Sequence, residues 1–236
     1  MQVLPIKTRI FRENENLTEF ILKYLEKIPK KNLEGSVLVV TSKIVALSEG
    51  RVVPILNKRQ KIKLIKQESD FAIETKIVWL TIKDGMVMAN AGIDESNANG
   101  KIILLPEDSF KAAEMIRKNL IKKYKIKNLG VLVTDSRTLP FRAGIVGAAL
   151  GYAGFEGIKN YVGKKDIFGR KFRMSKVDVA DSLATAAVVC MGEGAERQPL
   201  AVIKNAPVIF TKKINKKELI INRKVDIYAP LFNKLS

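Results

Sequence analysis

The chain has 236 residues, of which 42 are Lys or Arg, 24 are Asp or Glu, one is Cys and none is His, so its formal charge is +18. Without histidine it can form no Ser–His–Asp triad, no Cys–His pair and no imidazole metal site. A single Cys excludes an internal disulfide and a zinc knuckle. Any bound metal must therefore be a hard cation with oxygen ligands, such as magnesium, manganese or calcium.

Nothing in the sequence resembles a secretion signal or a membrane span. The opening stretch MQVLPIKTRIF is interrupted by Lys7 and Arg9, so it lacks the unbroken apolar run of a signal peptide. No window approaches the roughly 18 uncharged apolar residues that a membrane-spanning helix needs. We expect a cytoplasmic protein with no membrane contact.

The basic excess admits nucleic-acid binding, but the lysines are scattered along the chain. The two densest basic stretches, 57–66 and 211–224, contain no aromatic side chains for base stacking. We therefore do not expect a nucleic acid as the main partner, and small phosphorylated ligands would also favour a positive surface.

The hydrophobic pattern predicts a set of helices and strands in irregular order. In chain order, they are a helix over 17–28, a strand over 36–40, a hairpin of strands 76–83 and 86–89 joined at Asp84–Gly85, a helix over 110–124, a strand over 130–134, a helix over 181–191, and strands over 201–203 and 208–210. This irregular order, with at least one hairpin, favours an α+β fold of mixed sheets over a doubly wound parallel sheet. We expect a single unit over 1–236, in which a small subdomain is possible.

Five glycines between Gly144 and Gly157 recur every three or four residues, with alanines between them. The spacing is compatible with a phosphate-binding loop, but it favours a helix that packs closely against another backbone. Two other residues are expected in the core: Cys190, after a run of small apolar residues, and Trp79, in a predicted strand.

Three polar clusters follow predicted strands or helices, where functional loops are usually held: Asp94–Asn97, Asp135–Ser136 and Glu193. Their oxygens are suitable ligands for a hard divalent cation, although turn formation and helix capping explain each cluster taken alone. Ser42 and Lys43, directly after the strand 36–40, are candidate phosphate ligands or simply solvated residues.

Taken together, six segments resemble the coenzyme F-420-0:L-glutamate ligases, the γ-glutamyl ligases. They are TSKIVALSEGRVV (41–53), NAGIDESN (90–97), VTDSRTLPFRAGIVGAALGYAG (133–154), VGKKDIFGR (162–170), VADSLATAAVVCMGEGAE (179–196) and PLAVIK (199–204). Their order and spacing match over roughly residues 35–210.

The resemblance implies a GTP- and metal-dependent enzyme that joins L-glutamate to a substrate carboxylate through an acyl phosphate. It also implies an intertwined homodimer of unusual α+β fold and two Mg²⁺ or Mn²⁺ ions. The implied metal ligands are Asp94, Asp135, Ser136 and Glu193, and no catalytic side chain is assigned. The implied nucleotide contacts are Ser42, Lys43, Asn97, Met191, Gly192, Glu193, Gly194, Ala195, Glu196, Arg197 and Gln198.

The chain departs from the family pattern in four places. Leu47 stands where the family usually has a lysine, the nucleotide segment at Thr8–Phe11 matches poorly, and an arginine is shifted to Arg137, before Thr138. The stretch between Arg51 and Asn90 is also shorter than the family pattern implies. These changes keep open a sister ligase with another acceptor or amino acid, and a nucleotide-binding protein without ligase activity. GTP and ATP are not distinguished by these motifs.

Overall fold

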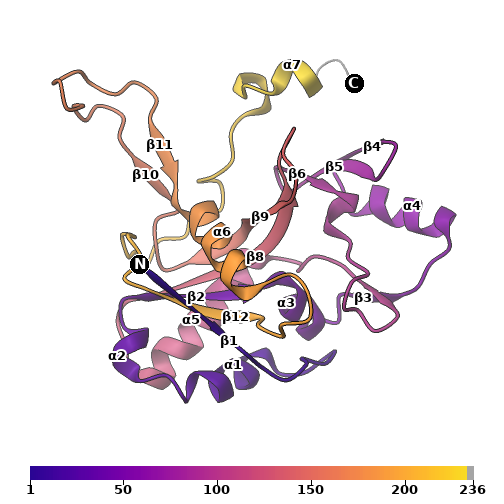
Figure 1. Ribbon diagram of the computed structural model, residues 1–236, viewed down its shortest axis with the longest axis horizontal. Helices are drawn as coiled ribbons and strands as arrows, with labels where there is room; N and C mark the ends of the chain where they lie inside the picture. Colours follow the sequence, from indigo (N-terminus) through magenta and orange to yellow (C-terminus); the bar gives the residue numbers. More distant parts are fainter. Residues whose placement is uncertain (233–236) are drawn as a thin grey trace.

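The computed structural model describes residues 1–232, and a five-stranded mixed sheet forms its centre (Figure 1). In spatial order the strands are β1 (Gln2–Ile6), β12 (Leu200–Lys204), β2 (Ser36–Thr41), β8 (Leu129–Thr138) and β9 (Ile145–Ala153). Only β2 and β8 run parallel, and every other neighbouring pair in this sheet is antiparallel. The expected α+β class with mixed sheets is confirmed.

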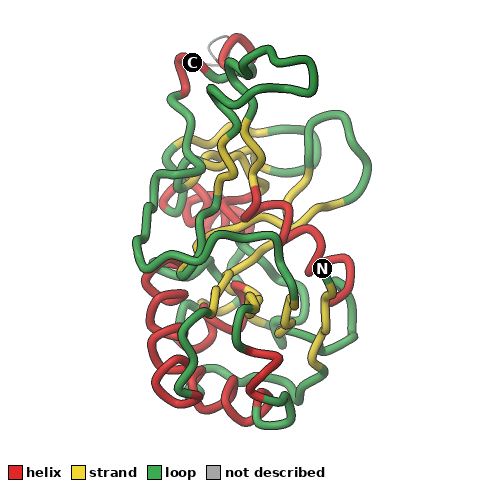
Figure 2. Tube along the Cα trace, turned by 90° about the vertical axis from the view of Figure 1, so that its left-hand side faces the viewer, coloured by secondary structure: helices red, strands yellow, loops and turns green. Residues whose placement is uncertain are grey.

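Helices cover both faces of this sheet because its central strands are apolar on both sides (Figures 1 and 2). Leu38 and Val40 of β2 pack on one face with α1 (Leu17–Leu25) and α5 (Ser109–Tyr124). Val37 and Val39 point to the other face, against α6 (Val179–Met191). The strict alternation along β2 therefore divides the core into two layers.

Smaller elements surround this core. They are the helices α2 (Lys30–Leu33), α3 (Ser42–Ser48), α4 (Lys58–Gln67) and α7 (Ala229–Phe232), the short helices η1 (Asn90–Gly92) and η2 (Arg223–Val225), and the strands β3 (Val52–Pro54), β4 (Phe71–Glu74), β5 (Trp79–Lys83), β6 (Met86–Ala89), β7 (Lys101–Ile103), β10 (Ile158–Asn160) and β11 (Lys176–Asp178). β4, β5 and β6 form a small antiparallel sheet, while β3 pairs with β7 and β10 with β11.

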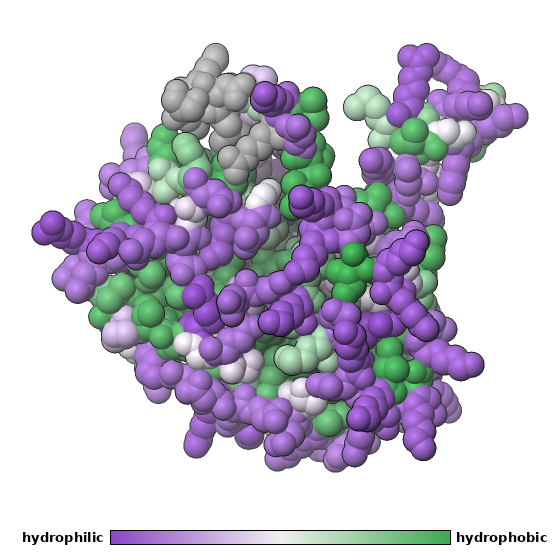
Figure 3. Space-filling model, turned by 180° about the vertical axis from the view of Figure 1, so that it is seen from behind, coloured by the Kyte–Doolittle hydropathy of each residue, from purple (hydrophilic) through white to green (hydrophobic). Residues whose placement is uncertain are grey.

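The β10–β11 ribbon projects from the body of the protein (Figures 1 and 3). Several apolar side chains on the connection between these two strands are almost fully exposed, namely Ile167, Phe168 and Met174. No helix within residues 1–232 is both long enough and apolar enough to cross a membrane.

Most predicted elements exist, with shifted ends. The first helix ends at Leu25, where the pattern predicted 28, and the first strand of the hairpin begins at Trp79, not 76. The hairpin turn at Asp84–Gly85 is confirmed, as β5 and β6 pair antiparallel around it. The strand predicted at 208–210 was wrong, because only Phe210 makes an isolated bridge there.

Two predictions about single residues were also wrong. Cys190 is exposed on α6, because the helix has solvent-facing positions even within its apolar sequence. Trp79 is only partly buried, and the Lys66 ammonium lies 5.0 Å from the centre of its ring.

The glycine-rich segment is a strand, β9, and not the helix that its spacing suggested. Its close packing is nevertheless confirmed, since a methyl group at Gly147 would lie 2.3 Å from the carbonyl oxygen of Ala184 in α6. A methyl group at Gly151 would lie 2.4 Å from the backbone nitrogen of Phe110 in α5. The glycines thus allow one strand to contact two helices at backbone distance.

A β-bulge explains how Gly147 and Gly151 face different helices. Val133 pairs with Gly151 and Thr134 pairs with Ala149, so Leu150 is an extra residue on β9. One extra residue reverses the alternation of side chains along a strand. The bulge therefore turns the second half of β9 towards the opposite face of the sheet.

Replacing Gly147 by alanine should destabilise the fold by about 1–3 kcal/mol or more, because the added methyl group collides with the backbone of α6. Chemical denaturation measures the change. Gly163→Ala is the control, as its methyl group would meet no atom within 4 Å and only its positive φ opposes the change. Equal losses in both variants would contradict close packing at Gly147.

Candidate functional site

Two cavities meet beside the end of the parallel strand pair. One is a groove of about 1750 Å³ and the other a smaller cavity of about 280 Å³. They share eight lining residues: Ser42, Lys43, Asp94, Ser96, Ile103, Asp135, Ser136 and Glu193. All four predicted metal ligands, and both residues of the Ser42–Lys43 pair, therefore line the junction.

Strand register explains why distant parts of the chain meet here. Thr41 of β2 lies beside Thr134 of β8, so the next residues, Ser42 and Asp135, leave the same edge of the sheet together. Parallel strands place their carboxyl ends at one edge, which is where ligands bind in many open α/β sheets. Ser42 also begins α3, a helix that the sequence pattern did not reveal.

Asp94 reaches the junction from a loop that β7 and β5 hold in place. Its backbone N–H donates to the carbonyl oxygen of Ile103 at 2.9 Å, and the Ile103 N–H donates to the backbone carbonyl oxygen of Asp94 at 2.9 Å. Upstream, the buried Ala91 N–H donates to Thr81 Oγ1 at 2.8 Å. These bonds fix the backbone on both sides of the carboxylate.

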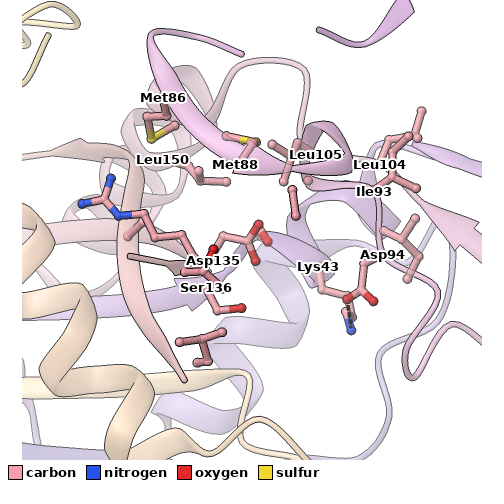
Figure 4. Close-up of a pocket in the computed structure, with 18 of the residues that line it drawn as sticks. Lys43, Met86, Met88, Ile93, Asp94, Leu104, Leu105, Asp135, Ser136 and Leu150 are labelled. Atoms are coloured by element: carbon pink, nitrogen blue, oxygen red, sulfur yellow. Dashed lines mark ion pairs between the residues drawn. The ribbon is translucent and has the colours of Figure 1, made fainter. Parts of the chain in front are cut away.

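The Lys43 ammonium lies against Asp94 (Figure 4). Its Nζ is 2.7 Å from Asp94 Oδ2 and donates to the Ser96 carbonyl oxygen at 2.8 Å. Desolvation alone would raise the pKa of Asp94, but the hydrogen bond and charge of Lys43 outweigh it, so the pKa is lowered. Asp94 is accordingly an anion at neutral pH.

The pKa values of Asp135 and Glu193 shift in the opposite direction, upwards. Although Asp135 as a residue is only half-buried, its carboxyl group is shielded from water, and this burial raises its pKa to about 6. Negative charge on Asp94 and Glu193 adds to the rise. Desolvation, and then the charges of Asp94 and Glu196, also raise the pKa of Glu193. The junction therefore concentrates more negative charge than its own cations neutralise.

The segment 191–198 forms one wall of the groove, and every one of its residues lines it. Asn97 closes the wall across the junction, as its Nδ2 donates to the carbonyl oxygen of Gly194 at 3.2 Å. Gly194 in turn donates its N–H to Glu196 Oε2 at 2.8 Å. The predicted nucleotide contacts from Met191 to Gln198, with Asn97, Ser42 and Lys43, thus lie in one groove.

The N-terminal segment also lines the groove despite its poor match to the family pattern. Thr8, Arg9, Ile10 and Phe11 face it, and the Thr8 N–H donates to the carbonyl oxygen of Arg197 at 2.9 Å. Leu47, the residue that replaces a lysine, lines the groove as well. Two of the departures from the family pattern therefore lie on the wall of the same groove.

The smaller cavity is apolar on the side away from the junction. Met86 and Met88 of β6, with Leu105 and the bulged Leu150, line that side, opposite Asp135 and Ser136 (Figure 4). None of these four residues is among the predicted site residues. No sequence motif links them, since they come from three separate places: β6, the segment after β7 and the bulge of β9.

An ion pair beside the small cavity was also missed. Arg137 Nη2 is bonded to Asp181 Oδ2, and Asp181 Oδ1 accepts a hydrogen bond from the Ala149 N–H at 2.8 Å. Asp181 lies in the first turn of α6, 44 residues from Arg137, so no local pattern links them.

The donor set is chemically suited to a hard divalent cation. Three carboxylates and the Ser136 hydroxyl surround the junction. Burial, together with the charges of neighbouring carboxylates, raises the pKa of Asp135 and Glu193, and a cation at the junction would favour their charged forms. Within residues 1–232, no three His, Cys, Asp or Glu side chains are grouped closely enough to hold a metal as they stand. Metal binding by Asp94, Asp135, Ser136 and Glu193 therefore stays a prediction.

Comparisons with known proteins identify the family of the chain. The family model described as F420-0:Gamma-glutamyl ligase matches residues 5–205. The coenzyme F420:L-glutamate ligase of Methanococcus maripaludis strain C7 is 32% identical over 246 aligned residues, which cover 97% of each chain. The protein of the same name from Methanocaldococcus jannaschii is 33% identical over 233 residues, covering 89% of this chain and 90% of its own. The chain therefore belongs to the F420-0:gamma-glutamyl ligase family.

Proposed function

We propose that the protein is a GTP- and divalent-metal-dependent ligase that forms an amide bond between L-glutamate and a carboxylate of the coenzyme F420 precursor. Its family supports the ligase class, since the relatives are named coenzyme F420:L-glutamate ligases. The observation that carries the proposal is the junction itself, where one set of carboxylates lines both a large groove and a small apolar cavity. Such a junction suits transfer between two different substrates.

The reaction needs activation of the carboxylate, because a carboxylate and an amine do not condense in water. Transfer of the γ-phosphoryl group of GTP to a carboxylate oxygen gives an acyl phosphate and GDP. The glutamate amine then attacks the acyl carbon, phosphate leaves with the C–O bond electrons, and the nitrogen loses a proton. This route requires no nucleophilic side chain, so a chain without histidine can perform it.

The two cavities divide the substrates between them. The groove lined by 191–198, Asn97 and Lys43 would hold the nucleotide with its phosphates at the junction. The small cavity would receive the acceptor, with its apolar wall of Met86, Met88 and Leu150 against a ring system. Lys43 is the cation at the boundary and would attract the γ-phosphate.

Asp94, Asp135, Ser136 and Glu193 would hold one or two Mg²⁺ or Mn²⁺ ions at this boundary. Bound divalent ions neutralise phosphate charge and orient the transferred group. The role of the chain is to keep these oxygen donors together at a site where their mutual repulsion favours a cation.

A sister ligase is the second candidate. The departures at Leu47 and Arg137–Thr138 line the groove and the small cavity respectively, so they would change substrate choice without removing the carboxylates. A nucleotide-binding protein without ligase activity is disfavoured, since a cluster of mutually repelling carboxylates destabilises a fold that has no use for it.

GTP with Mn²⁺ should stabilise the protein against heat. At a GTP concentration 100 times its dissociation constant, the folded state gains about 2.7 kcal/mol, which corresponds to roughly 5–10 °C for a chain of this size. Glu193→Gln should abolish the shift, because it removes a carboxylate at the junction. Thermal unfolding followed by circular dichroism measures it.

The matched control is Glu95→Gln, which makes the same charge change on an exposed side chain paired with Lys61 outside both cavities. It should keep the full GTP–Mn²⁺ shift. No shift in the wild-type protein, together with salt-resistant, sequence-selective RNA binding, would replace the ligase proposal by a nucleic-acid function.

Asp135→Asn should have opposite effects with and without metal. In EDTA at pH 7 it should raise the free energy of unfolding by an amount on the order of 1 kcal/mol, since it removes a shielded charge that Asp94 and Glu193 repel. With Mn²⁺ the wild-type protein should be stabilised and the variant should not. A variant that is less stable in EDTA and still responds to Mn²⁺ would contradict metal binding at the junction.

We also propose that the protein acts as a homodimer. The glycines of β9 pack against α5 and α6 of their own chain, so they give no support to a contact between subunits. The exposed Ile167, Phe168 and Met174 beyond the β10–β11 ribbon do support it, as they provide an apolar contact surface.

Light scattering at micromolar concentration should report twice the chain mass of 26.3 kDa. A stable homodimer of this kind should bury more than about 2000 Å². Phe168→Glu should shift the mass towards the monomer, whereas Ile77→Glu, at an equally exposed site outside the ribbon, should not. A monomer for the wild-type protein would refute the homodimer.

A further inference from the structure

Arg137 is placed where it can distinguish substrates. It lies on β8 two residues after Asp135, opposite Val146 of β9, and its side chain lines the small cavity but not the large groove. It is therefore on the side of the junction that the proposed function gives to the acceptor and the incoming amino acid. Because it does not line the groove, we expect no contact with a nucleotide bound there.

The guanidinium is fixed by Asp181, which two further hydrogen bonds hold in place. Asp181 bonds Arg137 Nη2 through Oδ2 and accepts the Ala149 N–H through Oδ1. Its own N–H donates to Asp178 Oδ1 at 2.9 Å. Since β9 and the first turn of α6 hold Asp181, Arg137 has a defined direction before any ligand arrives.

Most of the hydrogen-bonding capacity of Arg137 is unused. A guanidinium has five N–H donors in a planar fork, and among the described residues only Nη2 has a hydrogen-bond partner. Its Nε is shielded from solvent and has no partner within residues 1–232. Buried donors without partners are rare and costly. Nη1 also has no partner among the described residues and is not shielded from solvent, so its donors are open to an acceptor that a ligand supplies.

The other cation of the small cavity is already engaged. Lys43 is bonded to Asp94 and to Ser96 at the junction. Arg137 is thus the positive group of this cavity with donors to spare, and its side chain is 27% exposed. A planar fork of donors matches the two oxygens of a carboxylate better than an ammonium does.

From these observations we infer that Arg137 binds a carboxylate of a small-molecule substrate in the small cavity and thereby determines which acid the enzyme accepts. The inference rests on the proposed function for the identity of the substrates. The carboxylate belongs either to L-glutamate or to the acceptor, and both offer the same chemistry to the guanidinium. The simpler alternative is that Arg137 only ties β8 to α6 through Asp181.

The test compares Arg137→Gln and Arg137→Lys with Arg142→Gln in the full-length protein. Arg142 lies exposed in the turn after β8, outside both cavities, so its replacement makes the same charge change on the same hairpin. KM and kcat are measured for L-glutamate, F420-0 and GTP in turn. Calorimetry gives the dissociation constants of L-glutamate and F420-0, and thermal unfolding gives the stability of each variant.

Arg137→Gln should raise KM and the dissociation constant for one of the two acids by roughly tenfold to a hundredfold, the effect of losing a charged hydrogen bond. KM for GTP should not change, and Arg142→Gln should match the wild type. A change for L-glutamate alone assigns the carboxylate to the amino acid, and a change for F420-0 alone assigns it to the acceptor. Arg137→Lys should be intermediate, because it keeps the charge and loses the fork.

The inference is overturned if Arg137→Gln lowers the melting temperature and leaves the affinities for both acids unchanged, since that is the result of a purely structural tie. It is also overturned if KM for GTP rises together with both acids, because the residue would then act through the fold. Absence of turnover in the wild type would refute the proposed function. Calorimetry with L-glutamate and F420-0 would still decide the role of Arg137.

Discussion

The parallel pairing of β2 with β8 is the constraint on which the rest of the site depends. Because Thr41 lies beside Thr134, the chain must leave the sheet at one edge from two places nearly a hundred residues apart, which brings Ser42 and Asp135 together. An antiparallel pairing would send these residues to opposite ends of the sheet. The buried alternation of β2 holds that register, since a slip by one residue would exchange the two apolar layers.

The strand β9 brings two helices and a bulge next to this edge of the sheet. Its glycines let α6 and α5 approach at backbone distance, and the bulge at Leu150 turns the strand beside the site. Close approach of α6 brings Asp181 within reach of Arg137, and the end of α6 leads directly into the groove wall that begins at Met191. Packing and function are therefore joined in one segment, and loosening the contact at Gly147 would also displace the site.

Much of this could be predicted from the sequence where information is local. The apolar run 36–40 predicts a buried strand, and Asp84–Gly85 between two apolar runs predicts a hairpin, because each pattern fits a single local structure. The family motifs contain the residues that line the junction. For the glycine segment the predicted close packing was right but the predicted helix was wrong, because glycines three or four residues apart are compatible with a helix and also with a bulged strand. The apolar wall around Met86 and the Arg137–Asp181 pair were missed, since only tertiary contacts define them.

Charge balance connects the stability of the junction to its chemistry. Lys43 compensates Asp94 and lowers its pKa, whereas Asp135 and Glu193 have no cation of their own at bonding distance among the described residues. A second fixed lysine would satisfy them and make the fold more stable, but it would also occupy the position that the proposed site gives to a divalent ion. The unbalanced carboxylates are therefore what would be expected of a site that gains its positive charge from a ligand. The fold tolerates the repulsion between these carboxylates because the sheet beneath them is buried on both faces and is stable without any contribution from them.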